Sequence, residues 1–282
     1  MTPLIEVEEL KRLMDSGASY RLFDCRFDLT NPSAGLQSYQ EGHIPTAAFA
    51  DLDHDLAAPK NGRNGRHPLP SVSEWEATCA RLGISFDLPV IVYDNQGGMF
   101  AVRLWWMLRA CGHTQVSLLN GGYAAWLQTK LPHATGVETY PNTSAPSLKI
   151  YSQLFTVDQI VDNLKDSRYK ILDARSADRY RGENETLDPV GGHIPGALNR
   201  FFKDNLNEQG FFKSPIQLRE EFLAILGNTP PEKIIHQCGS GVTACHNLFA
   251  MELAGLPCAG IYSGSWSEWC SDSNRPVATG LH

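Results

Sequence analysis

The sequence lacks an apolar run of the roughly 20 residues that a membrane-spanning helix needs. It also lacks an excess of basic residues, since 24 Lys and Arg face 31 Asp and Glu and give a net charge of -7. A chain of that sign disfavours nucleic acid and anionic membranes, so neither is an expected partner. Residues 1–13 carry Glu6, Glu8 and Glu9 in an amphipathic pattern, unlike the basic start and apolar centre of a secretory signal.

The cysteines lack the spacing of a disulfide framework, and their number, seven, is odd. A reducing, cytoplasmic location is therefore expected. Cys238, Cys245 and His246 lie close together, but no second ligand pair at zinc-site spacing follows, so no metal is predicted. The Gly-Ser-Gly run after Cys238 has no following lysine, which excludes a nucleotide-binding P-loop, and no cofactor is predicted.

Short apolar segments alternate with helical patterns along the chain. This alternation is typical of an α/β fold with mostly parallel sheets flanked by helices. The expected strands are 21–24, 90–93 and 116–119, and the expected helices are 7–16, 73–82, 101–110 and 243–254.

The second half of the chain repeats motifs of the first half in the same order. Asp24-Cys25-Arg26 returns as Asp173-Ala174-Arg175, Gly42-His43-Ile44-Pro45 returns as Gly192-His193-Ile194-Pro195, and residues 121–126 match 264–269. Such internal repetition sets the architecture. We therefore expect a tandem duplication, with one domain at 1–135, a linker at 136–149 and a second domain at 150–282.

The duplication serves as an internal control, because a feature present in both copies is expected to be architectural. The two Asp-x-Arg pairs are then interpreted as structural ion pairs or loop clamps. His43 and His193 are interpreted as turn-stabilising residues. His43 also remains a candidate assisting residue, because one copy's histidine could face the other copy's loop.

Cys238 is not duplicated, because Asn95 stands at its position in the first copy. It lies between an apolar segment and a helical pattern, and Gly239 and Gly241 allow loop conformations that bring N-H groups around its sulfur. The start of the following helix adds further N-H donors, which favour the thiolate. A small buried residue at a strand end is the alternative interpretation. Only the second copy can carry thiol chemistry, so the first is expected to be inert.

Two arginines, Arg179 and Arg181, also have no match in the first copy. An arginine fork can bind a carboxylate or a sulfonate at two points, so either residue could anchor an anionic substrate. A solvated surface arginine paired with Glu183 or Glu185 is an equal alternative.

The segment Cys238-Gly239-Ser240-Gly241-Val242-Thr243-Ala244, together with the duplicated motifs, resembles two-domain rhodaneses of the 3-mercaptopyruvate sulfurtransferase type. The resemblance implies that Cys238 takes sulfur from a small anionic donor as a persulfide. It would then pass that sulfur to a thiol such as thioredoxin, or to cyanide. It also implies N-H donors from Gly239, Ser240, Gly241, Val242 and Thr243, a donor carboxylate on Arg179, and proton transfer assisted by His43 and Ser240.

The chain departs from that pattern in two places. Residues 186–190 contain no arginine where mercaptopyruvate enzymes often have a second one, and Phe27 and Asp28 stand where many members have a tryptophan. Arg181 is a candidate replacement for the missing arginine, and thiosulfate is the alternative donor. Thiosulfate-type members, however, typically carry cations directly after the cysteine, where this chain has Gly239 and Ser240.

Two other functional classes fit less well. A cysteine phosphatase needs an arginine six residues after the cysteine, and that position is Ala244. A non-catalytic sulfur carrier or binding module would fit the first half of the chain alone. The intact Cys238 loop opposes it for the whole chain.

Overall fold

A computed structural model describes residues 2–281 of the chain. The chain forms two compact units. Unit 1 comprises Met1–Ala58, Pro70–Ser152 and Glu208–Phe212, and unit 2 comprises Pro59–Leu69, Gln153–Asn207 and Lys213–His282. Each unit thus includes a short segment from the other half of the sequence. The domain bounds expected from the sequence stay a prediction.

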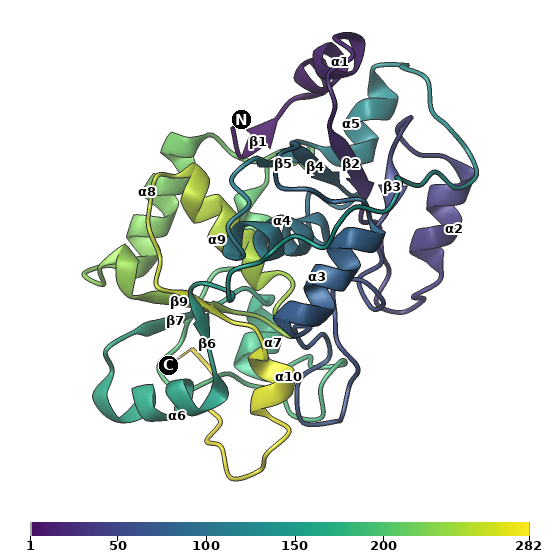
Figure 1. Cartoon of the computed structure of the whole chain (residues 1–282). Coiled ribbons are helices and arrows are strands. Elements are labelled where there is room, and N and C mark those ends of the chain that lie inside the picture. The colour runs from purple at the N-terminus through teal and green to yellow at the C-terminus, as the bar shows by residue number, and fades with distance from the viewer. Residues whose placement is uncertain (1, 282) are drawn as a thin grey trace. The chain divides into compact units, whose positions relative to one another are not determined.

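Unit 1 is built on a five-stranded sheet in the order β1-β5-β4-β2-β3, and every neighbouring pair of strands is parallel. Helices alternate with the strands in chain order (Figure 1). The strands are β1 (Leu4–Ile5), β2 (Arg21–Asp24), β3 (Ala48–Phe49), β4 (Val90–Tyr93) and β5 (Val116–Leu119), and the helices are α1 (Val7–Asp15), α2 (Ala34–Glu41), α3 (Val72–Arg81), α4 (Ala101–Ala110) and α5 (Gly122–Gln128).

Unit 2 repeats this topology with the order β6-β10-β9-β7-β8, again parallel throughout. The tandem α/β duplication expected from the sequence is therefore confirmed. The strands are β6 (Leu154–Phe155), β7 (Lys170–Asp173), β8 (Leu198–Asn199), β9 (Ile234–Gln237) and β10 (Gly260–Tyr262), and the helices are α6 (Val157–Asp166), α7 (Ala177–Arg181), α8 (Pro215–Leu226), α9 (Ala244–Leu253) and α10 (Ser265–Trp269), with 3-10 turns η1 (Phe202–Asn205) and η2 (Pro231–Lys233).

Local sequence explains where these elements begin and how they pack. The central strands β4 and β9 are buried at every residue, as expected for strands covered on both faces. Capping boxes start α3 at Ser71 and α6 at Thr156, each with its side chain bonded to the third helical residue. Large aromatic side chains contribute to both cores, and the tryptophans Trp105, Trp106, Trp126, Trp266 and Trp269 are buried. Among residues 2–281, no helix combines the length and apolar character needed to span a membrane.

The two Asp-x-Arg motifs form the same clamp in both units. The Arg26 Nε donates to both carboxylate oxygens of Asp24 at 3.0 and 2.9 Å, and its Nη2 donates to the Gly42 carbonyl at 2.6 Å. Arg175 binds Asp173 in the same way, and its Nη2 donates to the Gly192 carbonyl at 2.6 Å. The structural role predicted from the duplication is confirmed.

The duplicated histidines also make matching contacts. His43 Nδ1 lies 2.8 Å from the Tyr39 carbonyl oxygen, and His193 Nδ1 lies 2.9 Å from that of Tyr180. Each imidazole is stacked on the ring of the same tyrosine. The predicted turn-stabilising hydrogen bond is therefore present in both copies.

The loop of unit 1 that corresponds to the Cys238 loop closes around a carboxylate of its own. Asp94 follows β4, and its Oδ1 accepts from the N-H groups of Gln96 at 2.7 Å and Gly98 at 2.9 Å. Its Oδ2 accepts from Phe100 at 2.8 Å and Ala101 at 3.0 Å. The strand-loop-helix connection is thus an anion cradle, and in unit 1 its ligand is built in.

We predict that Asp94→Ala lowers the stability of unit 1 by about 3 kcal/mol, because four N-H groups lose a charged acceptor. A lower thermal midpoint, with unchanged turnover by the protein that remains folded, is the expected result. Asn95→Ala is the matched control, because Asn95 is exposed and adjacent. Equal midpoints for both variants would contradict the role given to Asp94.

Candidate active site

Cys238 follows the last residue of β9 and is buried, with 2% of its surface exposed. Its Sγ accepts hydrogen bonds from the N-H groups of Ser240 at 3.4 Å and Gly241 at 3.1 Å. Gly239, Val242 and Thr243, the other predicted donors, lie in the same loop but make no hydrogen bond to this sulfur within residues 2–281. A hydrogen bond to a charged acceptor is stronger than one to a neutral acceptor, so two such donors stabilise a thiolate more than they stabilise a neutral thiol.

The comparison with unit 1 shows why a sulfur occupies this cradle. Gly98, whose N-H binds Asp94, corresponds to Gly241, whose N-H binds Cys238. Asp94 itself corresponds to Gln237, whose side chain is neutral, buried and without a hydrogen-bond partner in the described part of the chain. Because Gln237 supplies no carboxylate to accept from the N-H groups of Ser240 and Gly241, these groups donate to the Cys238 sulfur instead.

Gly241 is required by the shape of the loop. Its φ is +78°, and a Cβ there would lie 2.2 Å from the Ser263 carbonyl oxygen. Any side chain would therefore move the N-H away from the sulfur.

Ser265 holds the backbone of Cys238 and was not identified from the sequence. Its Oγ accepts from the Cys238 N-H at 3.1 Å and donates to the Tyr262 carbonyl at 2.9 Å. The residue has a φ of +57°, a conformation that costs about 1 kcal/mol or more for a residue with a side chain. Unit 1 has Gly122 at this position, with a φ of +56°. A serine in place of a glycine that needs a positive φ is a difference between the two copies, and it could have identified Ser265 from the sequence.

His67 is a second residue that sequence reasoning missed. Its Nδ1 lies 2.8 Å from the Ser240 Oγ, and both residues are buried. It belongs to Pro59–Leu69, the early segment that is part of unit 2. The corresponding loop of the second half, residues 199–214, contains no histidine, and this difference between the copies could have identified it.

Two arginines lie against the residue that follows Cys238. A Cβ on Gly239 would lie 2.6 Å from Arg66 Nη2 and 3.5 Å from Arg179 Nη2. Arg179 was predicted, whereas Arg66 was not, because it comes from the same early segment as His67. The loop itself is neutral, so these two guanidinium groups bring positive charge to it from elsewhere in unit 2.

Carboxylates hold both arginines. Arg179 donates to Glu185 from Nε at 3.0 Å and from Nη2 at 2.9 Å, and Asp188 contacts Arg66 and Arg179 together. Burial raises the pKa of Glu185. The hydrogen bonds from Arg179 and from the Leu187 N-H together lower this pKa by more, so the net pKa lies below its ordinary value. For Asp188 burial prevails over Arg66, and the net pKa is raised.

The two candidate assisting residues lie in other surroundings. Arg181 pairs with Glu183 through bonds of 2.8 and 2.7 Å, and the two side chains are 28% and 53% exposed. His43 is fully buried in unit 1, between its bond to Tyr39 and a 3.4 Å contact with Glu138. Their roles as assisting residues stay predictions.

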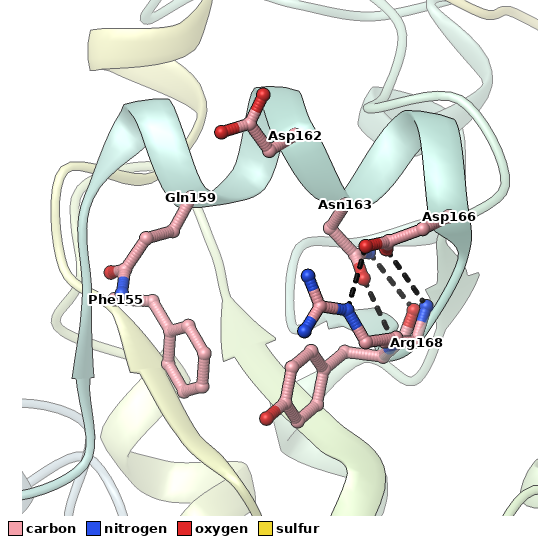
Figure 2. Close-up of a pocket in the computed structure, with 7 residues that line it drawn as sticks. Phe155, Gln159, Asp162, Asn163, Asp166 and Arg168 are labelled. Carbon is pink, nitrogen blue, oxygen red and sulfur yellow. Dashed lines mark hydrogen bonds and ion pairs between the residues drawn. The ribbon is translucent and has the colours of Figure 1, made fainter.

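A cavity of about 220 Å³ lies elsewhere in unit 2, beside α6 (Figure 2). Its lining includes Asp166 and Arg168, which form an ion pair of 2.6 Å. None of the residues around Cys238 lines it, so this cavity is separate from the thiol site.

The family model of the rhodanese-like domain matches residues 6–129 and 156–272. With its two parallel sheets and a single cysteine in the cradle of the second, the chain belongs to the rhodanese family.

Three relatives give the same result. A probable 3-mercaptopyruvate sulfurtransferase of Pseudomonas aeruginosa is 46% identical over 92% of both chains. A thiosulfate sulfurtransferase of Mus musculus is 37% identical over 90% of this chain and 86% of its own. The solved 3-mercaptopyruvate sulfurtransferase of Leishmania major superposes with a TM-score of 0.86 at 30% identity, covering 98% of this chain and 77% of its own. The protein is a sulfurtransferase, as the sequence predicted.

We predict that Ser265→Gly and Ser265→Ala both lower kcat about three- to tenfold, because each removes the acceptor for the Cys238 N-H. Ser265→Gly should be the more stable variant by about 1 kcal/mol, because glycine relieves the positive φ. Steady-state kinetics and thermal melts measure the two effects. Wild-type kcat in both variants would show that the hydrogen bond does not support the reaction.

Proposed function

We propose that the protein transfers sulfur from 3-mercaptopyruvate, through a persulfide on Cys238, to a thiol such as thioredoxin or to cyanide. The observation that carries the proposal is the Cys238 sulfur held by two backbone N-H groups in a neutral loop, with Arg66 and Arg179 beside Gly239. The identity to the Pseudomonas aeruginosa relative supports this donor. Because no disulfide joins cysteines within the described residues, we also propose a reducing compartment, the cytoplasm.

The first step forms one sulfur-sulfur bond and breaks one carbon-sulfur bond. The Cys238 thiolate attacks the donor sulfur, and the electron pair of the broken bond passes to the donor carbon as an enolate. The proton of the donor thiol ends on that carbon and gives pyruvate, which leaves Cys238 as a persulfide anion. No oxidant or reductant is consumed.

The second step regenerates the enzyme. A thiolate or cyanide attacks the outer sulfur, and the sulfur-sulfur bond breaks with its electron pair on Cys238. The N-H groups of Ser240 and Gly241 then stabilise the departing thiolate, as they did before the first step.

Neighbouring residues divide the remaining tasks. Arg66 and Arg179 attract the donor carboxylate, since a guanidinium group binds it at two points. Ser240 and His67, 2.8 Å apart, provide a path for the proton that moves from the donor thiol to the enolate carbon. A buried path keeps this proton from bulk water.

Thiosulfate is the second candidate donor, and the two guanidinium groups beside Gly239 favour it as well. Attack on its outer sulfur would give the same Cys238 persulfide and release sulfite. The 37% identity to the mouse enzyme supports this alternative. Turnover of the two donors with one common acceptor discriminates between them, and we expect the higher kcat/KM for 3-mercaptopyruvate.

We predict that incubation with 3-mercaptopyruvate releases one pyruvate per chain and adds the mass of one sulfur atom to the peptide containing Cys238. Cys238→Ser should abolish both signals, because a serine hydroxyl cannot form the persulfide. Mass spectrometry and a pyruvate assay provide the readouts. Cys258→Ser, at a half-buried cysteine outside the loop, is the control that should retain them. Full transfer by Cys238→Ser would disprove the mechanism.

We predict that Arg179→Gln and Arg66→Gln each raise KM for 3-mercaptopyruvate by about tenfold or more and change kcat less, because each removes a cation from the donor site. Arg168→Gln serves as the control, because Arg168 is exposed and pairs with Asp166 beside α6. An unchanged KM in either site variant would remove that arginine from the donor site.

A further inference from the structure

Asp188 occupies the position between the two arginines of the site. Its Oδ1 accepts from Arg66 Nη1, and its Oδ2 accepts from Arg179 Nη2 at 3.3 Å. Only 3% of its side chain is exposed. The carboxylate therefore contacts the same two guanidinium groups that reach Gly239, next to the reactive sulfur.

The backbone keeps this carboxylate in place. Glu185 Oε1 accepts from the N-H groups of Leu187 at 2.9 Å and Asp188 at 3.1 Å, while the same carboxyl group binds Arg179. One short loop thus supplies two carboxylates, and it fixes their positions relative to Arg179 through its own hydrogen bonds.

The charges of this network are balanced. Arg66 and Arg179 pair with Asp188 and Glu185, and Arg175, which also contacts Glu185 at 3.4 Å, pairs with Asp173. An anionic donor that approaches Gly239 meets Arg179 Nη2, which already donates to Glu185 and Asp188, and Arg66 Nη2, whose guanidinium group is paired with Asp188 through Nη1. The donor therefore competes with Asp188 for the two guanidinium groups, and the Asp188 carboxylate repels it. The repulsion grows with the charge of the donor, so a dianion is penalised more than a monoanion.

We propose that Asp188 is a specificity-determining residue: a tethered carboxylate that competes with the donor for Arg66 and Arg179 and favours singly charged donors over doubly charged ones. The inference deepens the proposed function and rests on it for the assignment of the donor site. It assigns to Asp188 an effect on KM, whereas the chemistry at Cys238 is unaffected.

The kinetic test compares the wild type with Asp188→Asn, a substitution that keeps the shape and removes the charge. We expect KM to fall on the order of tenfold for thiosulfate and about threefold for 3-mercaptopyruvate, with kcat nearly constant. Asp166→Asn removes one carboxylate from another Asp-Arg pair of unit 2 and should change neither KM (Figure 2). A higher or unchanged KM in Asp188→Asn would overturn the proposal, since Asp188 would then only hold the arginines in position.

A binding measurement tests the inference without turnover. In Cys238→Ser protein, calorimetry with pyruvate and with sulfate should give tighter binding when Asp188→Asn is added, and the gain should be larger for sulfate. Equal gains, or none, would refute the specificity role. If the wild type did not use 3-mercaptopyruvate, the proposed donor would be refuted. The binding measurement would still test the role of Asp188, because it does not depend on turnover. Thermal melts check folding, and Asp188→Ser replaces Asp188→Asn in both tests if the amide variant does not fold.

Discussion

Backbone N-H groups converging on an anion after a central strand are the interaction on which this protein depends. Unit 1 fills its cradle permanently with the carboxylate of Asp94, which takes four N-H groups. Unit 2 places the Cys238 sulfur against two. A carboxylate completes the cradle of unit 1, whereas the cradle of unit 2 holds a sulfur, the atom that the proposed function requires. Two exchanges separate the copies: Asp94 for the neutral Gln237, and Asn95 for Cys238.

The surroundings of Cys238 follow from this requirement. Backbone N-H groups stabilise charge on a sulfur only if the loop keeps them in position. Gly241 and Ser265, each with a positive φ, fix the conformation of the backbone around Cys238. The loop carries no cation of its own. In the proposed function, the positive charge that attracts an anionic donor comes from Arg66 and Arg179, which carboxylates hold in place.

Much of this arrangement could be predicted from the sequence because the chain contains two copies of one domain, which can be compared with each other. The central strands are short apolar segments and the helices follow helical spacing, so element positions followed from local pattern. The bounds of α1, β2, β4, α4 and β5 lie at or within a residue of those expected. The duplication distinguished the Asp24–Arg26 and Asp173–Arg175 clamps from Cys238. The exchange of Gly122 for Ser265 is visible in the same comparison, but only the fold shows that Ser265 has a positive φ and accepts from the Cys238 N-H.

The α/β duplication, the family and the single cysteine in a glycine-bearing loop can be recognised from motifs of neighbouring residues along the chain. The side chains that surround that cysteine are brought together by the fold. His67 meets Ser240 across 173 residues, and Arg66 meets Asp188 across 122. Contacts at such separations are produced by the packing of Pro59–Leu69 into unit 2, and no periodicity in the sequence encodes that packing. The sequence therefore identified Cys238 as the candidate site, whereas the charged and polar side chains around it could be identified only from the fold.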